Sequence, residues 1–246
     1  MSLKQTEAIV IKSYSLSEAD RIVVFFTREY GLIRGVAKGA KRLQSKFGST
    51  LEPFSTVSLT FFQKEERELV SIQSVELTRS RFAVASDPDF LRTYSYIGDL
   101  LTDFSFPHDA DEKLYRMLSA CLSAASDHSQ LSAVGLYFEL WLLRLSGFLP
   151  DWSRCSGCGR EIDPATENFV VPGFHLQCPA CKKSYAIGVV NSADLLIFNS
   201  VQRLSPADFI SFAEPRTDSI PVVSNVMKRL IALALGREVA GGAALR

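Results

Sequence analysis

Alternating apolar and polar residues mark short strands in the first eighty residues. The run Thr56–Gln63 places Val57, Leu59 and Phe61 on one face, which is the period of a half-buried strand. Four more runs rich in Val, Ile and Phe predict strands at Gln5–Lys12, Arg21–Thr27, Leu32–Val36 and Leu69–Leu77. No strand pattern runs from residue 37 to 53, and a charged turn is expected at 64–68. Five strands with a long excursion after the third predict a small five-stranded barrel.

Helical spacing replaces alternation beyond residue 86. Asp87 is suited to cap a helix and Pro88 to be its first residue. A third helix is expected from Ser129 or Ser132 to Gly147, where glycine favours a helix end. The other expected helices are Phe90–Phe104, Asp111–Ala125, Ser192–Val201, Pro206–Phe212 and Val222–Gly236. The fold class is therefore expected to be α+β.

Four regions follow from this pattern. We expect a strand domain at 1–81, a helical domain made of 82–150 and 191–246, and a cysteine-rich insert at 151–190. The chain has 246 residues, of which 47% are hydrophobic and 22% charged, so most of it is expected to fold rather than stay disordered. No run approaches the ~20 apolar residues of a membrane span, and the N-terminal segment is unlike a signal peptide. We therefore expect a cytoplasmic protein without a membrane partner.

Charge is balanced overall but uneven along the chain. Lys plus Arg and Asp plus Glu both total 27, yet residues 1–81 hold 13 basic and 9 acidic residues, a balance of +4. Most of that excess lies in RGVAKGAKRLQSK, which holds five basic and no acidic residues: Arg34, Lys38, Lys41, Arg42 and Lys46. A basic loop beside a small barrel is a means of tracking single-stranded nucleic acid. The alternative is a solvated loop without a partner.

Aromatic residues surround this basic segment. Tyr30 precedes it, and Phe47 and Phe54 flank its end. Each could stack on a base, but packing into the barrel is the favoured interpretation for each. In the pair Phe61-Phe62 the two side chains point to opposite faces of a strand, so at most one is buried inside the barrel.

Four of the five cysteines form a metal-binding pattern. Cys155, Cys158, Cys178 and Cys181 are spaced C-x2-C-x19-C-x2-C, which is typical of a tetrahedral zinc site. Two thiolates three residues apart can bind one ion from a tight turn. Disulfides are the alternative, and a reducing compartment favours zinc. We expect Cys121, at a helical apolar position, to be a core residue.

The same pattern argues against catalysis. A shell of four thiolates has no open position for water or substrate, so it indicates a structural zinc. The chain has three histidines, and it lacks a nucleophile elbow, a paired-histidine metal motif, a dinucleotide fingerprint and a Walker loop. His175, three residues before Cys178, is disfavoured as a ligand because four cysteines complete the shell. We expect no enzyme activity and no catalytic residue.

Several stretches resemble the bacterial RecO family of DNA repair and recombination proteins. They are TEAIVIKSYSLSEADRIVVFFTREYGLIRGVAKGAKR near the N-terminus, FGSTLEPFS at 47–55, YFELWLLRLSGFLPDWSRCSGCG at 137–159 and LGRE at 235–238. The resemblance implies an OB-fold N-terminal domain, a helical C-terminal domain and a zinc-ribbon-like insert. It also implies a non-enzymatic mediator that binds single- and double-stranded DNA, anneals complementary strands and helps load RecA onto strands coated by single-strand binding protein.

The resemblance further implies two protein partners, RecR and the acidic C-terminal tail of the single-strand binding protein. We expect the tail at the helical domain, with Arg116 and Arg144 as cationic contacts, although both could be plain surface charges. A nucleoid-associated place in the cytoplasm is expected. The alternative functions are a zinc-ribbon protein of RNA metabolism or transcription and, less favoured, a zinc-dependent enzyme.

Overall fold

The computed structural model describes residues 2–63, 68–82, 87–124, 130–182 and 185–237. The chain divides into two compact units, Met1–Leu122 and Ser123–Arg246. The region boundaries expected at 81, 150 and 190 were drawn where the expected elements change from strands to helices or to the cysteine-rich insert. These boundaries remain a prediction. Apart from Glu68, the expected charged turn at 64–68 lies outside the described residues.

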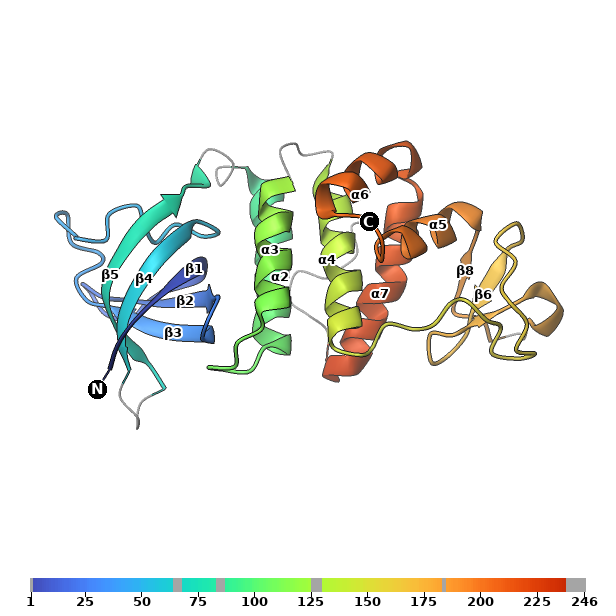
Figure 1. Cartoon of the computed structure of the whole chain (residues 1–246), viewed down its shortest axis with the longest axis horizontal. Coiled ribbons are helices and arrows are strands. Elements are labelled where there is room, and N and C mark those ends of the chain that lie inside the picture. The colour runs from blue at the N-terminus through green and yellow to red at the C-terminus, as the bar shows by residue number, and fades with distance from the viewer. Residues whose placement is uncertain (1, 64–67, 83–86, 125–129, 183–184, 238–246) are drawn as a thin grey trace. The chain divides into compact units, whose positions relative to one another are not determined.

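The first unit contains a closed barrel of five strands (Figure 1), as expected from the alternation. The strands follow the order β1-β2-β3-β5-β4 and are β1 (Ser2–Ser15), β2 (Arg21–Thr27), β3 (Gly31–Ala37), β4 (Thr56–Gln63) and β5 (Val70–Arg79). β1 is long enough to pair with β4 through its first half and with β2 through its second half. The barrel closes where β3 and β5 run parallel, through only two residue pairs.

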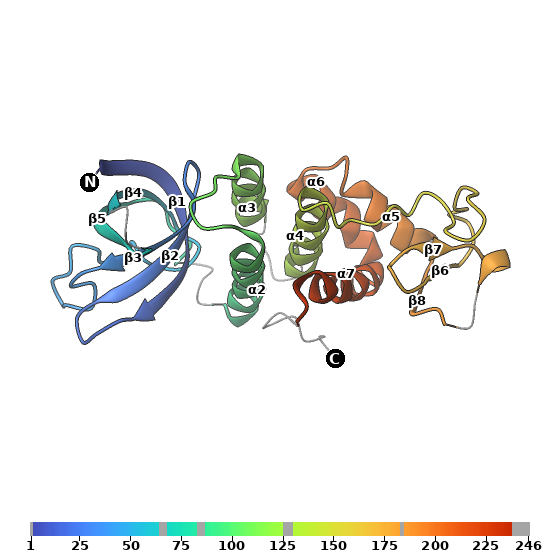
Figure 2. The same ribbon diagram turned by 90° about the horizontal axis from the view of Figure 1, so that it is seen from below.

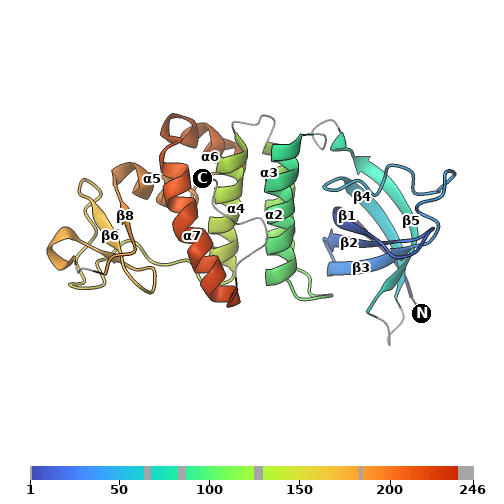
Figure 3. The same cartoon turned by 180° about the vertical axis from the view of Figure 1, so that it is seen from behind.

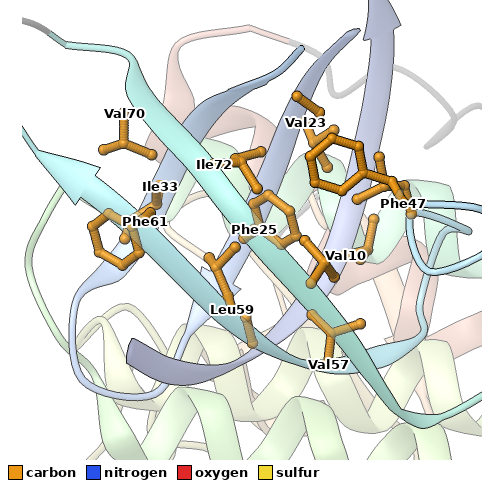
Figure 4. Close-up of a cluster of buried hydrophobic side chains, with 14 residues drawn as sticks. Val10, Val23, Phe25, Ile33, Phe47, Val57, Leu59, Phe61, Val70 and Ile72 are labelled. Atoms are coloured by element: carbon orange, nitrogen blue, oxygen red, sulfur yellow. The ribbon is translucent and has the colours of Figure 1, made fainter. Parts of the chain in front are cut away.

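The barrel interior is filled by the inward-facing residues of all five strands. Val10, Phe25, Ile33, Leu59 and Phe61 are buried there and point toward one another (Figure 4). Gly35 lies at the closing pair, where a Cβ would stand 2.7 Å from Ile72 Cγ1. Glycine is therefore needed at this position for strand packing rather than for a flexible loop.

Two helices cover one outer face of the barrel. α2 (Pro88–Phe104) starts at Asp87, whose side chain accepts a hydrogen bond from the Asp89 amide, so the predicted cap is confirmed. α3 (Glu112–Ala124) places the Tyr115 ring 6.1 Å from Phe26, and the Tyr115 hydroxyl donates to Glu7. The helices explain why β2 is buried on both faces.

The second unit is built around α4 (Leu131–Leu145) and α7 (Ser219–Leu235), which pack against each other (Figure 3). α5 (Ser192–Ser200) and α6 (Pro206–Ala213) pack against α7 and α4 respectively. α7 begins three residues before the predicted start, because Pro221 falls in the first turn, where a missing N–H breaks no helical hydrogen bond. Within the described ranges, no helix is long and apolar enough to cross a membrane.

The cysteine-rich insert contains a three-stranded sheet in the order β7-β6-β8 (Figure 2). Its strands are β6 (Asn168–Val170), β7 (Leu176–Gln177) and β8 (Gly188–Val190), and a short 3-10 turn, η2 (Pro179–Cys181), follows β7. Strands of two or three residues are too short to give a visible alternation, so the sequence pattern did not predict them.

Candidate metal centre and nucleic-acid interface

The four cysteines of the insert converge on one point. Their sulfur atoms all lie within 4.8 Å of one another, and Cys158 Sγ is 3.9 Å from Cys178 Sγ. Four thiolates at ~2.3 Å from one tetrahedral zinc are ~3.8 Å apart. The four-cysteine cluster can therefore hold a metal ion, and its donor set and size are compatible with zinc.

Backbone amides prepare Cys155 to be a thiolate. Its sulfur accepts from the amides of Gly157 and Cys178, each at 3.4 Å. Burial opposes ionisation, but these backbone hydrogen bonds outweigh it and lower the pKa of Cys155 to about 6. Hydrogen bonds with Cys158 and Cys178 raise the pKa of Cys181 to about 12. A cation held by the four sulfurs would displace the protons that remain on the thiols.

The first cysteine turn leaves no room for a side chain at Gly157. A Cβ there would stand 3.0 Å from Cys181 Cβ and 3.2 Å from its sulfur. The turn is closed by hydrogen bonds from the Gly159 amide to the Cys155 carbonyl and from the Cys155 amide to the Arg160 carbonyl, both 2.8 Å. The insert is also anchored by Trp152, whose ring stacks on Phe198 of α5 with centroids 4.1 Å apart.

All five predicted DNA-contacting residues are exposed, and all belong to the first unit. Arg34 lies on β3, and the other four lie on the segment 38–55 that follows it. We call this segment the basic loop. The Lys41 ammonium donates to the Ser17 carbonyl at 2.8 Å, and Lys46 donates to the Gln73 carbonyl at 2.5 Å. The loop thus extends from the β1–β2 turn to β5 across one end of the barrel.

Asp20 holds the start of the basic loop, and the charge pattern did not predict this role. Its carboxylate accepts from the Gly39 amide at 2.8 Å, and the neighbouring Ala19 carbonyl accepts from the Lys41 amide at 3.0 Å. The only sequence signal is an acid placed in the turn before β2, within the SEAD stretch. Asp20 is therefore a positioning residue for the loop.

The aromatic residues near the loop pack into the protein. Phe47 and Phe54 are each 1% exposed, and Tyr30 is half-buried with its ring edge-on to Phe61. Packing into the barrel is confirmed for Phe47, whereas Phe54 is buried outside the barrel core, against Phe90 and Tyr94 of α2. Phe61 is fully buried and Phe62 is half-buried, as expected for neighbours on opposite faces of β4.

Arg116 and Arg144 lie in different units. Arg116 is exposed on α3, and Arg144 is exposed at the end of α4, where its guanidinium lies 4.7 Å from the centroid of the Trp141 ring. Arg144 also borders a hollow of about 460 Å³ that is lined in part by Leu149, Pro150 and Phe198. Asp151, also at this hollow, is engaged by Ser153, whose side chain and amide lower its pKa.

Comparison with known proteins agrees with this architecture. Residues 1–81 match the family described as "Recombination protein O N terminal", and residues 86–209 match "Recombination protein O C terminal". A protein named DNA repair protein RecO from Koribacter versatilis is 34% identical over 161 residues, which are 65% of this chain and 66% of that protein.

Two further relatives carry the same name. The protein from Syntrophotalea carbinolica is 33% identical over 67% of this chain and 64% of its own length. The protein from Bifidobacterium longum is 30% identical over 80% of this chain and 83% of its own length. The match spans just under two thirds of the length of the first two relatives. Two family matches in order and relatives that cover most of the chain lead to one conclusion: the chain belongs to the RecO family of DNA repair proteins.

Proposed function

We propose that this chain is a non-enzymatic mediator of recombination that binds single- and double-stranded DNA and anneals complementary strands. The observation that carries the proposal is a set of five exposed cations, Arg34 on β3 and four on the basic loop, whose backbone is fixed by Asp20 and by buried Phe47. Cations on a fixed backbone can contact phosphates at little cost in ordering entropy.

The proposed mechanism is neutralisation of two strands at one surface. Arg34, Lys38, Lys41, Arg42 and Lys46 would contact phosphates and release counterions. This lowers the repulsion between complementary strands and raises their local concentration, so annealing accelerates. On strands coated by single-strand binding protein, the same contacts would help to load RecA, with RecR as a partner and the nucleoid of the cytoplasm as the place of action.

The decisive experiment measures DNA binding and annealing across a salt series, with and without single-strand binding protein. Five contacts to a single strand predict a slope of log affinity against log salt near −3.5, from about −0.7 per contact. Annealing should persist on the protein-coated strands. A salt-independent affinity, or annealing lost on coated strands, would contradict the proposal.

We propose that the four-cysteine cluster holds one structural zinc. Its support is the convergence of four sulfurs and the amides that stabilise the Cys155 thiolate. When bound, the metal would cross-link the two cysteine turns, and Cys155, Cys158, Cys178 and Cys181 would complete its shell. Elemental analysis of protein purified without chelator should give about one zinc per chain, and less than half an equivalent would count against the site.

We also propose that the hollow beside Arg144 receives the tail of the single-strand binding protein. Leu149, Pro150 and Phe198 offer apolar contacts to the last side chain of such a tail, and Arg144 offers a cation to its terminal carboxylate. The remaining lining is polar and includes Asp151, so the proposed contact depends on Arg144. Arg116 remains a proposed second contact. Arg144→Glu should weaken binding of the intact partner but leave binding of the tail-deleted form unchanged. Equal binding of the two forms by the unmodified chain would overturn this part.

A further inference from the structure

A second hollow, of about 520 Å³, opens on the outside of the barrel over β3, β5 and β4. The strand register places three of its residues in one row, with Val36 opposite Ser71 and Ser71 opposite Phe62. Their chain neighbours Val70 and Phe61 point into the barrel (Figure 4), so alternation turns Ser71 and Phe62 outward. The hollow forms because the small Ser71 stands between two larger side chains.

The composition of this hollow is that of a small-ligand site. Its volume falls within the roughly 300–1,000 Å³ of such sites, which combine apolar walls with a few polar groups. Val36, Leu69 and Phe62 supply apolar walls, and all three are half-buried. Lys38 and Glu68 bring one charge of each sign. Phe62 adds a flat ring that is only partly covered.

The hollow adjoins the cations of the proposed DNA surface. Lys38 belongs both to the hollow and to the basic loop. Arg34 lies 3.5 Å from Glu68 in an ion pair whose two side chains are 45% and 71% exposed. Such an exposed pair is worth only ~0–1 kcal/mol, so Arg34 can exchange Glu68 for a phosphate. A ligand complementary to cations beside an aromatic ring carries both phosphates and flat apolar groups. A single nucleic-acid strand has both.

We propose that this hollow takes one unpaired base of a bound single strand, stacked on Phe62, while Arg34 and Lys38 hold the adjacent phosphates. The inference rests on the proposed DNA binding and adds a base-contacting site to it. Stacking requires a base but no particular one, because every base has a π face. Stacking on Phe62 therefore contributes affinity that depends on the presence of bases and does not change with salt, unlike the phosphate contacts of Arg34 and Lys38.

The test compares two oligonucleotides of equal length, one of thymidines and one fully abasic, on the intact chain. Both carry the same phosphates, so the ratio of their affinities isolates the base contact. Phe62→Ala should reduce that ratio by about 5- to 100-fold, the range for loss of one stacked base. The salt slope should stay at its original value, because no cation has been removed.

Two further variants guard against an unfolded barrel. Ser71→Leu fills the hollow, keeps Phe62, and should lower the same ratio without lowering the melting temperature. Phe106→Ala removes an exposed phenylalanine of the same unit that does not line this hollow, and it should behave as the unmodified chain.

Unchanged ratios in Phe62→Ala and Ser71→Leu would overturn the proposal. It would also be overturned if these variants bound DNA as the unmodified chain does but no longer bound a partner protein, because the hollow would then be a protein-binding site. If the proposed DNA binding itself is wrong, the result is different: the affinity of the unmodified chain for either oligonucleotide will not depend on salt.

Discussion

The basic loop and the cysteine-rich insert are both turn-rich segments with candidate chemistry, but they are held in shape by different groups. The loop is fixed mainly by groups that are not expected to touch DNA: the Asp20 carboxylate, backbone hydrogen bonds and the buried side chains of Phe47 and Leu51. The ammonium groups of Lys41 and Lys46 add two hydrogen bonds to carbonyls of the barrel. In the insert, the residues that would bind the ligand also hold the turns together, because Cys155 accepts hydrogen bonds from both cysteine turns.

This difference determines in which region a binding residue can be changed without loss of stability. Exposed cations on a separately anchored backbone can be changed without unfolding the barrel. Thiolates that face one another repel when ionised, so their arrangement would depend on a cation that neutralises them.

Charge reversal in the loop should have the largest functional effect. Lys41→Glu together with Arg42→Glu should nearly abolish annealing, because two phosphate contacts become repulsive, while the circular dichroism spectrum and melting temperature stay close to the original. The matched control is Lys113→Glu on α3 with Arg92→Glu on α2, which reverses as much charge on the same unit. Annealing at the original rate with unchanged salt dependence would move the DNA site elsewhere.

Loss of one thiolate should loosen the insert and spare the barrel. In Cys158→Ser we expect faster hydrogen exchange at the amides of Val171 and Ile187, which now donate to carbonyls within the insert, and no change in β1 and β2. Ser156→Ala alters the same turn without removing a ligand and should exchange normally. Unchanged protection in Cys158→Ser would show that the metal does not hold the insert.

Phe47 and Leu43 offer a stability test within the loop itself. Phe47→Ala should lower the free energy of unfolding by about 3–5 kcal/mol, because it empties part of the barrel core. Leu43 is fully exposed, so Leu43→Ala should change the free energy of unfolding by no more than about 0.5 kcal/mol. Denaturant titration measures both. Similar values for the two variants would contradict the idea that Phe47 anchors the loop.

Asp20 can be tested with a pair of substitutions that remove the same charge. Asn keeps an oxygen that accepts from the Gly39 amide, whereas Ala leaves that donor without its partner. A hydrogen bond of about 1 kcal/mol predicts that Asp20→Ala binds DNA about fivefold more weakly than Asp20→Asn. Equal affinities would mean that charge alone, and not loop position, is what Asp20 contributes.

The smallest effect is expected from removing one loop cation. Lys41→Ala should make the slope of log affinity against log salt shallower by about 0.7 and weaken all sequences alike. Its control is Lys113→Ala on α3, which should leave the slope unchanged. An unaltered slope in Lys41→Ala would remove this residue from the phosphate contacts.

Local patterns in the sequence were enough to predict much of the architecture. Two-residue alternation marked the last two barrel strands and short runs rich in Val, Ile and Phe marked the first three. The Asp87-Pro88 pair marked the start of α2, and the spacing of the four cysteines predicted their cluster. These signals succeed because each arises from residues close in the chain, where backbone geometry alone sets which side chains share a face or a turn.

Contacts between distant residues were decided only by the tertiary structure. The parallel pairing of β3 with β5 brings Val36 opposite Ser71, thirty-five positions apart, and so creates the outer hollow. The contact of Asp20 with Gly39 and the burial of Phe47 depend equally on how the barrel closes. Composition marked the basic loop as charged, but closure of the barrel decides where the loop is anchored, because its partners Asp20 and Gln73 lie far from it in the sequence.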